Sequence, residues 1–142
     1  LIGLVGSEMC IRDRLITPNR TEAALLAGYG MDAPIETLLK ALTVENVIIT
    51  GVHRGEEIGY CARLNGQYME IFKPCLPQTL HGTGDVFVST LCGELMNGKG
   101  MPQALKDAAE FCDDCVQKTA KRGESHWYGL AFEDKLKEGR GL

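Results

Sequence analysis

A short apolar run in the middle of the chain most constrains its fold. Val47, Ile48 and Ile49 stand together before Thr50 and Gly51. An uninterrupted apolar run of this length is typical of a parallel strand that is buried on both faces by helices. Segments with a helical spacing of apolar residues precede and follow the run. We therefore predict an α/β fold built from layers of helices and sheet.

Spacing and turn signals predict the other elements. Asn65-Gly66 separates two strand-like runs and is the strongest short signal for a β-hairpin, which would be added at one edge of the sheet. Apolar periodicity and capping residues mark the helices. We expect the tail of a strand at 15–17, strands at 47–50, 58–64 and 67–72, a loop at 73–80, and helices at 21–27, 34–42, 85–96, 102–121 and 132–137.

The clearest chemical signal is Gly82-Thr83-Gly84-Asp85 at the predicted start of a helix. The first N–H groups of a helix lack intrahelical partners and carry partial positive charge, which suits a phosphate or a developing oxyanion. Glycine lets a ligand approach the backbone, and an Asp at this place can take a proton from an attacking hydroxyl. The alternative is that Thr83 or Asp85 only caps the helix.

The first residues differ in character from the rest. Residues 4–14 resemble the translation of a transposase sequencing adapter, and position 1 is not Met. The alternative is a natural strand and turn at the start of the chain. We interpret residues 1–14 as a sequencing artefact and leave them out of the fold prediction. Residues 15–142 are then the natural part, which would begin within a longer gene.

Composition argues against several classes of protein. The net charge is −4 and the one short basic run is 118–122, so nucleic-acid binding has little support. No apolar run approaches the roughly 20 residues that cross a bilayer. Cys112 and Cys115 form a C-x-x-C pair, but no second ligand pair follows, and His126 alone cannot complete a zinc site. We expect reduced thiols in a cytoplasmic protein.

Three motifs occur in an order that is typical of one kinase group. They are Leu-Ile-Thr-Pro-Asn-Arg-Thr-Glu at 15–22, Val-Ile-Ile-Thr-Gly at 47–51 and Gly-Thr-Gly-Asp-Val-Phe at 82–87. Together they resemble the C-terminal half of a ribokinase-superfamily kinase, and most of all the pyridoxal/pyridoxamine kinases. The resemblance covers residues 15 to about 138, with a similar tail at 128–133. It implies the C-terminal part of a three-layer α/β/α domain with an incomplete sheet and an added hairpin.

The resemblance implies ATP and Mg²⁺ and assigns roles near the first two motifs. Asn19 and Glu22 would help to place the metal and the phosphates, although their three-residue spacing also suits a capping box. Thr17 would lie where related enzymes hold a monovalent cation. Thr50 would reach the nucleotide phosphates, with ordinary strand-end capping as the alternative. The carboxyl ends of strands are where open α/β sheets bind ligands, which favours the functional interpretation of both threonines.

The resemblance also assigns the chemistry of the third motif. Asp85 would act as general base on the hydroxymethyl group of a vitamin B6 compound, with Gly82, Thr83 and Gly84 as the anion hole. The implied reaction is direct in-line phosphorylation of pyridoxal, pyridoxamine or pyridoxine by ATP. Gly51, where many relatives carry serine, and Arg20 depart from the pattern of the group.

Other interpretations stay open. Hydroxymethylpyrimidine kinases more often carry Cys at the position of Asp85, and sugar kinases of the superfamily usually carry Ala at that of Thr83, so these residues favour a B6 kinase. A non-catalytic nucleotide-binding fragment is a third alternative, although a carboxylate would repel an anionic ligand. In this group the N-terminal half supplies most of the vitamin pocket, so we expect the 142-residue chain to be inactive. A half domain also leaves sheet edges and apolar surface exposed, so we expect the chain to be poorly soluble. Dimers are common among relatives, which leaves a homodimer open.

Overall fold

The computed structural model describes residues 15–75 and 83–122. These residues belong to two compact units, which divide between Pro74 and Cys75. The predicted α/β class, with an incomplete sheet and an added hairpin, is confirmed by a four-stranded sheet and four helices. The helix predicted at 132–137 lies outside the described residues. No helix in the described ranges is long and apolar enough to cross a membrane.

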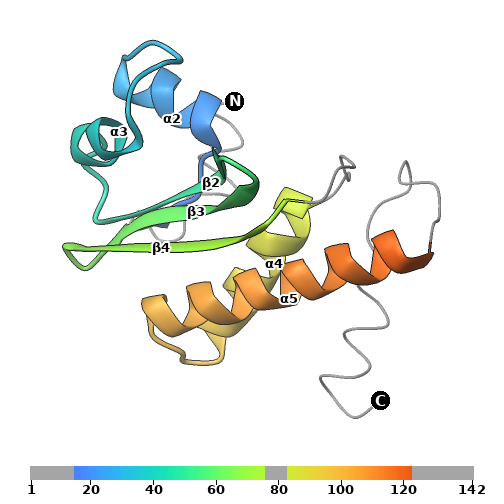
Figure 1. Cartoon of the computed structure of the whole chain (residues 1–142). Helices are drawn as coiled ribbons and strands as arrows, with labels where there is room; N and C mark the ends of the chain where they lie inside the picture. The colour runs from blue at the N-terminus through green and yellow to red at the C-terminus, as the bar shows by residue number, and fades with distance from the viewer. Residues whose placement is uncertain (1–14, 76–82, 123–142) are drawn as a thin grey trace. The chain divides into compact units, whose positions relative to one another are not determined.

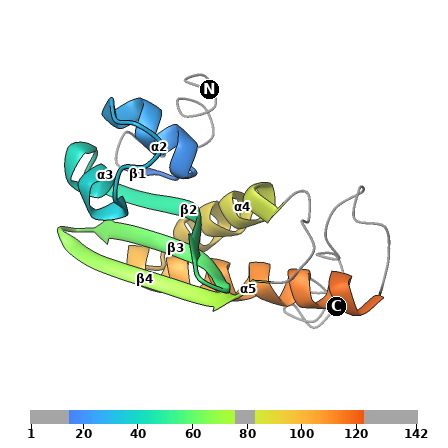
Figure 2. The same cartoon turned by 45° about the horizontal axis from the view of Figure 1, so that its top comes forward.

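The first unit contains a sheet with the strand order β1-β2-β3-β4 (Figure 2). Strand β1 (Leu15–Ile16) pairs in parallel with β2 (Asn46–Arg54), whereas β3 (Glu57–Leu64) and β4 (Gln67–Pro74) add in antiparallel fashion. The parallel pair requires a crossover connection, which the two helices α2 (Arg20–Ala27) and α3 (Ile35–Ala41) supply.

Helices α2 and α3 lie on the same face of this sheet (Figure 1). They pack there because their apolar residues recur at helical spacing and meet the alternate residues of β2. The resulting core consists of Ile16, Ala23, Ala24, Ile35, Leu38, Leu39, Leu42, Val47, Ile49, Val52 and Cys61. The predicted helix boundaries agree with the observed ones to within one residue at each end.

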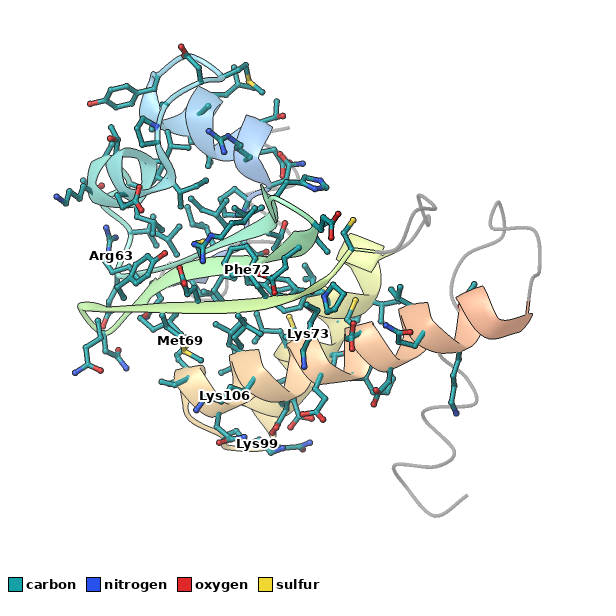
Figure 3. The ribbon with its side chains drawn as sticks, viewed as in Figure 1. Arg63, Met69, Phe72, Lys73, Lys99 and Lys106 are labelled. Atoms are coloured by element: carbon teal, nitrogen blue, oxygen red, sulfur yellow. The ribbon has the colours of Figure 1, made fainter. Side chains whose placement is uncertain are left out.

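Hydrogen bonds to the hairpin fix the end of α3 and the start of β2. The Arg63 guanidinium donates hydrogen bonds to the main-chain carbonyls of Leu39, Leu42 (2.6 Å) and Val44 (2.5 Å), and Figure 3 shows Arg63 beside α3. These carbonyls lack intrahelical partners, and a cation is favoured at a helix C-terminus. Asn46, which is buried, accepts a hydrogen bond from the main-chain N–H of Asn65 at 2.8 Å.

The predicted hairpin turn is confirmed. Asn65 and Gly66 join β3 to β4 with φ angles of 52° and 80°. Positive φ at both central residues is the requirement of a type I′ turn, which Asn-Gly meets at low cost. The predicted loop at 73–80 is wrong at its start, because Lys73 and Pro74 still pair with β3. Pro74 ends an edge strand, where a missing N–H is tolerated.

The prediction that the central strand ends at Gly51 is also wrong. Strand β2 continues to Arg54, and its register against β3 shifts between Ile49 and Val52. Three steps along β2 therefore match two steps along β3, which is a β-bulge. Gly51 lies in this bulge with φ of 65°. The glycine marks a kink within the strand instead of its end.

The second unit contains two packed helices, α4 (Thr83–Met96) and α5 (Met101–Arg122). Phe87 and Leu91 of α4 are buried, as are Leu105 and Ala108 of α5. The connection between them is held by Lys99, whose ammonium lies 2.6 Å from a Glu94 carboxylate oxygen and 2.5 Å from one of Asp107. Cys112 and Cys115 are buried on α5, and neither forms a disulfide with another described residue.

Candidate functional site

The site predicted on the first unit lies at the carboxyl ends of the parallel strands β1 and β2. The chain leaves β1 through Thr17 and Pro18 and enters α2 at Asn19. The Thr50 main-chain N–H donates to the Pro18 carbonyl at 2.9 Å, and Asn19 and Thr50 form an isolated parallel bridge. The structure therefore brings Thr17, Asn19 and Thr50 together, as expected for residues at the same edge of a sheet.

Asn19 and Glu22 form a complete capping box. Asn19 Oδ1 accepts a hydrogen bond from the Glu22 N–H at 2.8 Å, and Glu22 Oε1 accepts one from the Asn19 N–H at 2.9 Å. The capping alternative is thus observed. It leaves the metal-binding role open, because a carboxylate has two oxygens and about four acceptor positions. The box also fixes the Glu22 carboxyl group at the N-terminus of α2.

Thr17 carries an unusual buried hydroxyl. Its side chain is 3% exposed, and its Oγ1 has no hydrogen-bond partner within the described part of the chain. A buried hydroxyl without a partner costs about 1–3 kcal/mol, so such groups are rare without a reason. An oxygen of this kind at the end of a strand suits an added ligand, and a monovalent cation fits that description.

Arg20 contributes a contact that the sequence did not predict. Its Nη2 donates to the Ala33 carbonyl at 2.8 Å and so links the first turn of α2 to the segment before α3. The sequence showed Arg20 only as a departure from the family pattern. No local signal identifies this bond, since the two residues are 13 positions apart.

The third motif lies at the start of the second unit. Helix α4 begins at Thr83, so Gly84 and Asp85 are in its first turn, as predicted. The side chains of Thr83 and Asp85, and the whole of Gly82, lie outside the described parts. A Cβ placed on Gly84 would meet no heavy atom within 4 Å. This turn presents main-chain N–H groups of the kind that bind anions.

The oxygen donors of the first unit fit Mg²⁺ chemistry. Mg²⁺ is a hard cation that keeps several waters and is commonly held by one or two carboxylates together with substrate phosphates. Glu22 supplies a carboxylate, and Asn19 and Thr50 supply neutral oxygens beside it. Among the described residues there is no group of three or more His, Cys, Asp or Glu side chains that could hold a metal ion alone.

The first unit thus has an α/β fold with oxygen donors at the carboxyl ends of two parallel strands. A family model described as phosphomethylpyrimidine kinase matches residues 2–129. The chain belongs to this family. Because the match includes residues 2–14, it does not separate them from the rest, and the boundary at residue 15 stays a prediction.

The relatives of the chain include several pyridoxal kinases. Pyridoxal kinase PdxY of Rubrobacter xylanophilus is 29% identical over 133 residues, which are 86% of this chain and 46% of that protein. The crystal structure of pyridoxal kinase from Lactobacillus plantarum matches with a TM-score of 0.76 at 30% identity, over 87% of this chain and 48% of that one. The predicted resemblance is confirmed.

A second structure, pyridoxal kinase from Staphylococcus aureus in complex with AMP-PCP, shares the fold. Its TM-score is 0.67 at 23% identity, over 81% of this chain and 45% of that one. The chain thus spans about half the length of the relatives that it matches.

Proposed function

We propose that the chain is the ATP- and anion-binding part of a cytoplasmic kinase that phosphorylates the hydroxymethyl group of pyridoxal, pyridoxamine or pyridoxine. The observation that carries this proposal is the contact between the ends of β1 and β2, where Asn19 and Thr50 meet beside Glu22. Family membership supports phosphoryl transfer, and the two pyridoxal kinases at 29% and 30% identity support the substrate class. The S. aureus protein was solved with AMP-PCP, an analogue of ATP, which supports the nucleotide.

The proposed mechanism assigns a role to each predicted site residue. Asn19 and Glu22 would hold Mg²⁺, which neutralises phosphate charge when bound. Thr50 would contact the nucleotide phosphates, and the Thr17 hydroxyl would bind a monovalent cation. Asp85 would accept the proton of the substrate hydroxyl as it attacks, while the main-chain N–H groups of Gly82, Thr83 and Gly84 stabilise the charge on the transferring phosphoryl group.

A second candidate substrate follows from the family model itself. The model is that of phosphomethylpyrimidine kinase, so a hydroxymethylpyrimidine is the competing acceptor. Both acceptors present a hydroxymethyl group on an aromatic ring. Substrate choice should be measured as the ratio of kcat/KM values for pyridoxal and hydroxymethylpyrimidine, because this ratio reports differential binding of the two transition states.

The gene is first sequenced across the Arg14–Leu15 junction to obtain the native coding sequence. The experiment then uses the full protein that this gene encodes. Asp85→Asn should lower kcat by about 10²–10⁴-fold, the usual contribution of a general base, and leave ATP binding intact. Asp32→Asn, at an exposed position between α2 and α3, is the matched control and should retain full turnover. Near-normal turnover of Asp85→Asn would contradict the assignment. Binding of ATP without phosphoryl transfer by the unaltered chain would favour a non-catalytic nucleotide-binding protein.

A further inference from the structure

Arg20 occupies an unfavourable place for a cation. It is the first residue of α2, where the helix dipole favours acidic side chains and disfavours basic ones. Its side chain is nonetheless half-buried and donates from Nη2 to the Ala33 carbonyl at 2.8 Å. A long side chain loses rotamer freedom when it is fixed in this way. The position of Arg20 therefore requires an explanation other than the stability of the helix itself.

The bond joins the first turn of α2 to a point that the core holds in place. The connection between α2 and α3 leaves the C-terminus of α2 at Gly28, whose N–H donates to the Ala24 and Leu25 carbonyls. The connection comes back to the first turn at Ala33, which packs against the core of the first unit. Because the donor is charged, the hydrogen bond from Arg20 is of the stronger kind. Arg20 thus closes the connection against the start of the helix.

The same turn is also held by strand β2. The Thr50 N–H donates to the Pro18 carbonyl at 2.9 Å, and Thr50 forms the parallel bridge with Asn19. Together with the bond between Arg20 and Ala33, these contacts fix the start of α2 to the strand and to the helix connection. A main chain that is fixed from two elements holds the side chains of its first turn in defined positions.

Glu22 is the side chain of this turn that such fixing would serve. Residues two positions apart on a helix do not face one another, so Arg20 and Glu22 project from different sides of α2. Within residues 15–75 and 83–122, Glu22 forms no ion pair, and only its Oε1 accepts a hydrogen bond, from the Asn19 N–H at 2.9 Å. The basic residue that is nearest in sequence is engaged by Ala33, and the second carboxylate oxygen has no partner among these residues.

We infer that Arg20 is a positioning residue for the divalent cation of the proposed kinase. Its bond to Ala33 holds the first turn of α2, and with it the Glu22 carboxylate, and the same bond keeps the guanidinium charge away from that carboxylate. The inference rests on the proposed function, in which Glu22 helps to hold Mg²⁺. Contacts that orient a metal ligand commonly affect metal affinity as well as the ligand does. Arg20 acts through Glu22 and is not itself a ligand.

The test measures how strongly Mg²⁺ increases the affinity for the nucleotide. Calorimetry gives the Kd of AMP-PCP for the full protein that the gene encodes, once with saturating Mg²⁺ and once with a chelator. The ratio of the two values reports the coupling between metal and nucleotide on the protein. Arg20→Met removes the donor and the charge and keeps an unbranched apolar stem. Arg20→Gln, which is neutral and shorter, is the second variant in case Arg20→Met fails to fold.

Arg63→Met is the matched control. Arg63 likewise donates to main-chain carbonyls of the helix connections, but at the end of α3 and before the start of β2, away from the carboxyl ends of the parallel strands. Arg63→Met should lower the melting temperature and leave the Mg²⁺ effect on AMP-PCP affinity unchanged within about twofold. The control thus shows what a purely structural loss of an arginine does.

Arg20→Met should reduce the Mg²⁺ effect about tenfold, the lower end of what loss of an outer contact of a metal ligand costs, with the Kd in chelator nearly unchanged. A Mg²⁺ effect equal to that of the unaltered protein would overturn the inference and leave Arg20 as a structural clamp. The unaltered protein would still bind and use the nucleotide in that case, so the proposed function would stand. Failure of the unaltered protein to bind AMP-PCP under either condition would overturn both.

Discussion

Glu70 on β4 is held by two neighbours on the same sheet. The Arg54 guanidinium donates to both of its carboxylate oxygens at 2.8 and 2.7 Å, and the Tyr68 hydroxyl donates at 2.7 Å. Arg54 also stacks over the Phe72 ring, 4.0 Å from its centroid. The Arg54 guanidinium, and after it the Tyr68 hydroxyl, lower the pKa of Glu70 to about 2.

The lowered pKa predicts a pH-dependent contribution to stability. A carboxyl group whose pKa is lower in the folded state stabilises that state above its unfolded pKa, here 4.5, and loses this effect as the pH falls toward 2. Glu70→Gln should therefore lower the melting temperature at pH 7, and the difference from the unaltered protein should shrink between about pH 4.5 and pH 2. Glu56→Gln, in the β2–β3 turn, is the control. A difference that stays constant down to pH 2 would contradict the role of this ion pair.

At the scale of elements, Arg63 is the residue that ties the hairpin to α3. Its guanidinium is half-buried and bonds to three carbonyls at the end of α3 and in the connection to β2. Arg63→Met keeps much of the apolar stem and leaves those carbonyls without their donor. We expect the free energy of unfolding to fall by about 3 kcal/mol in a urea titration. Lys40→Met, in the exposed last turn of α3, should change it by less than about 0.5 kcal/mol.

The elements that the sequence predicted correctly are those with local causes. Apolar spacing and caps located α2 and α3, and Asn65-Gly66 located the hairpin, because these signals act within a few residues. Gly51 misled the prediction, since a glycine after an apolar run indicates a strand end and a bulge equally well. The bulge is decided by the pairing of β2 with β3, which no local pattern shows.

In the candidate site, too, features with local causes could be predicted from the sequence, and features that depend on long-range contacts could not. The Asn19–Glu22 spacing indicated the capping box as one of two interpretations, and the box is observed. The strand ends predicted Thr17 and Thr50 as ligand positions, whereas the bridge between Asn19 and Thr50 was not predicted. The Arg20–Ala33 bond and the buried Thr17 hydroxyl depend on residues brought together only by folding. The spacing of residues in the sequence does not indicate these long-range contacts.

At the scale of the whole molecule, the chain spans about half the length of its relatives. Its exposed apolar surface therefore affects whether the chain self-associates when it is produced alone. Within the described residues, β1 pairs on one side only, with β2. Leu25 and Tyr29, on and after α2, are 61% and 49% exposed, and Met31 is 55% exposed. Exposed apolar residues on and after α2, together with a short edge strand, favour association between chains.

We therefore expect the 142-residue chain, produced as written, to self-associate and to lack kinase activity. Leu25→Lys together with Met31→Lys should shift its mass toward the monomer in size-exclusion chromatography with light scattering, because two charges replace two exposed apolar side chains. Met96→Lys is the matched control, since Met96 is 87% exposed but lies apart in sequence at the end of α4, and this change should leave the association unaltered. A soluble, cooperatively melting monomer that phosphorylates pyridoxal would contradict the expectation. It would show that the proposed ATP- and anion-binding part can assemble a working site by itself.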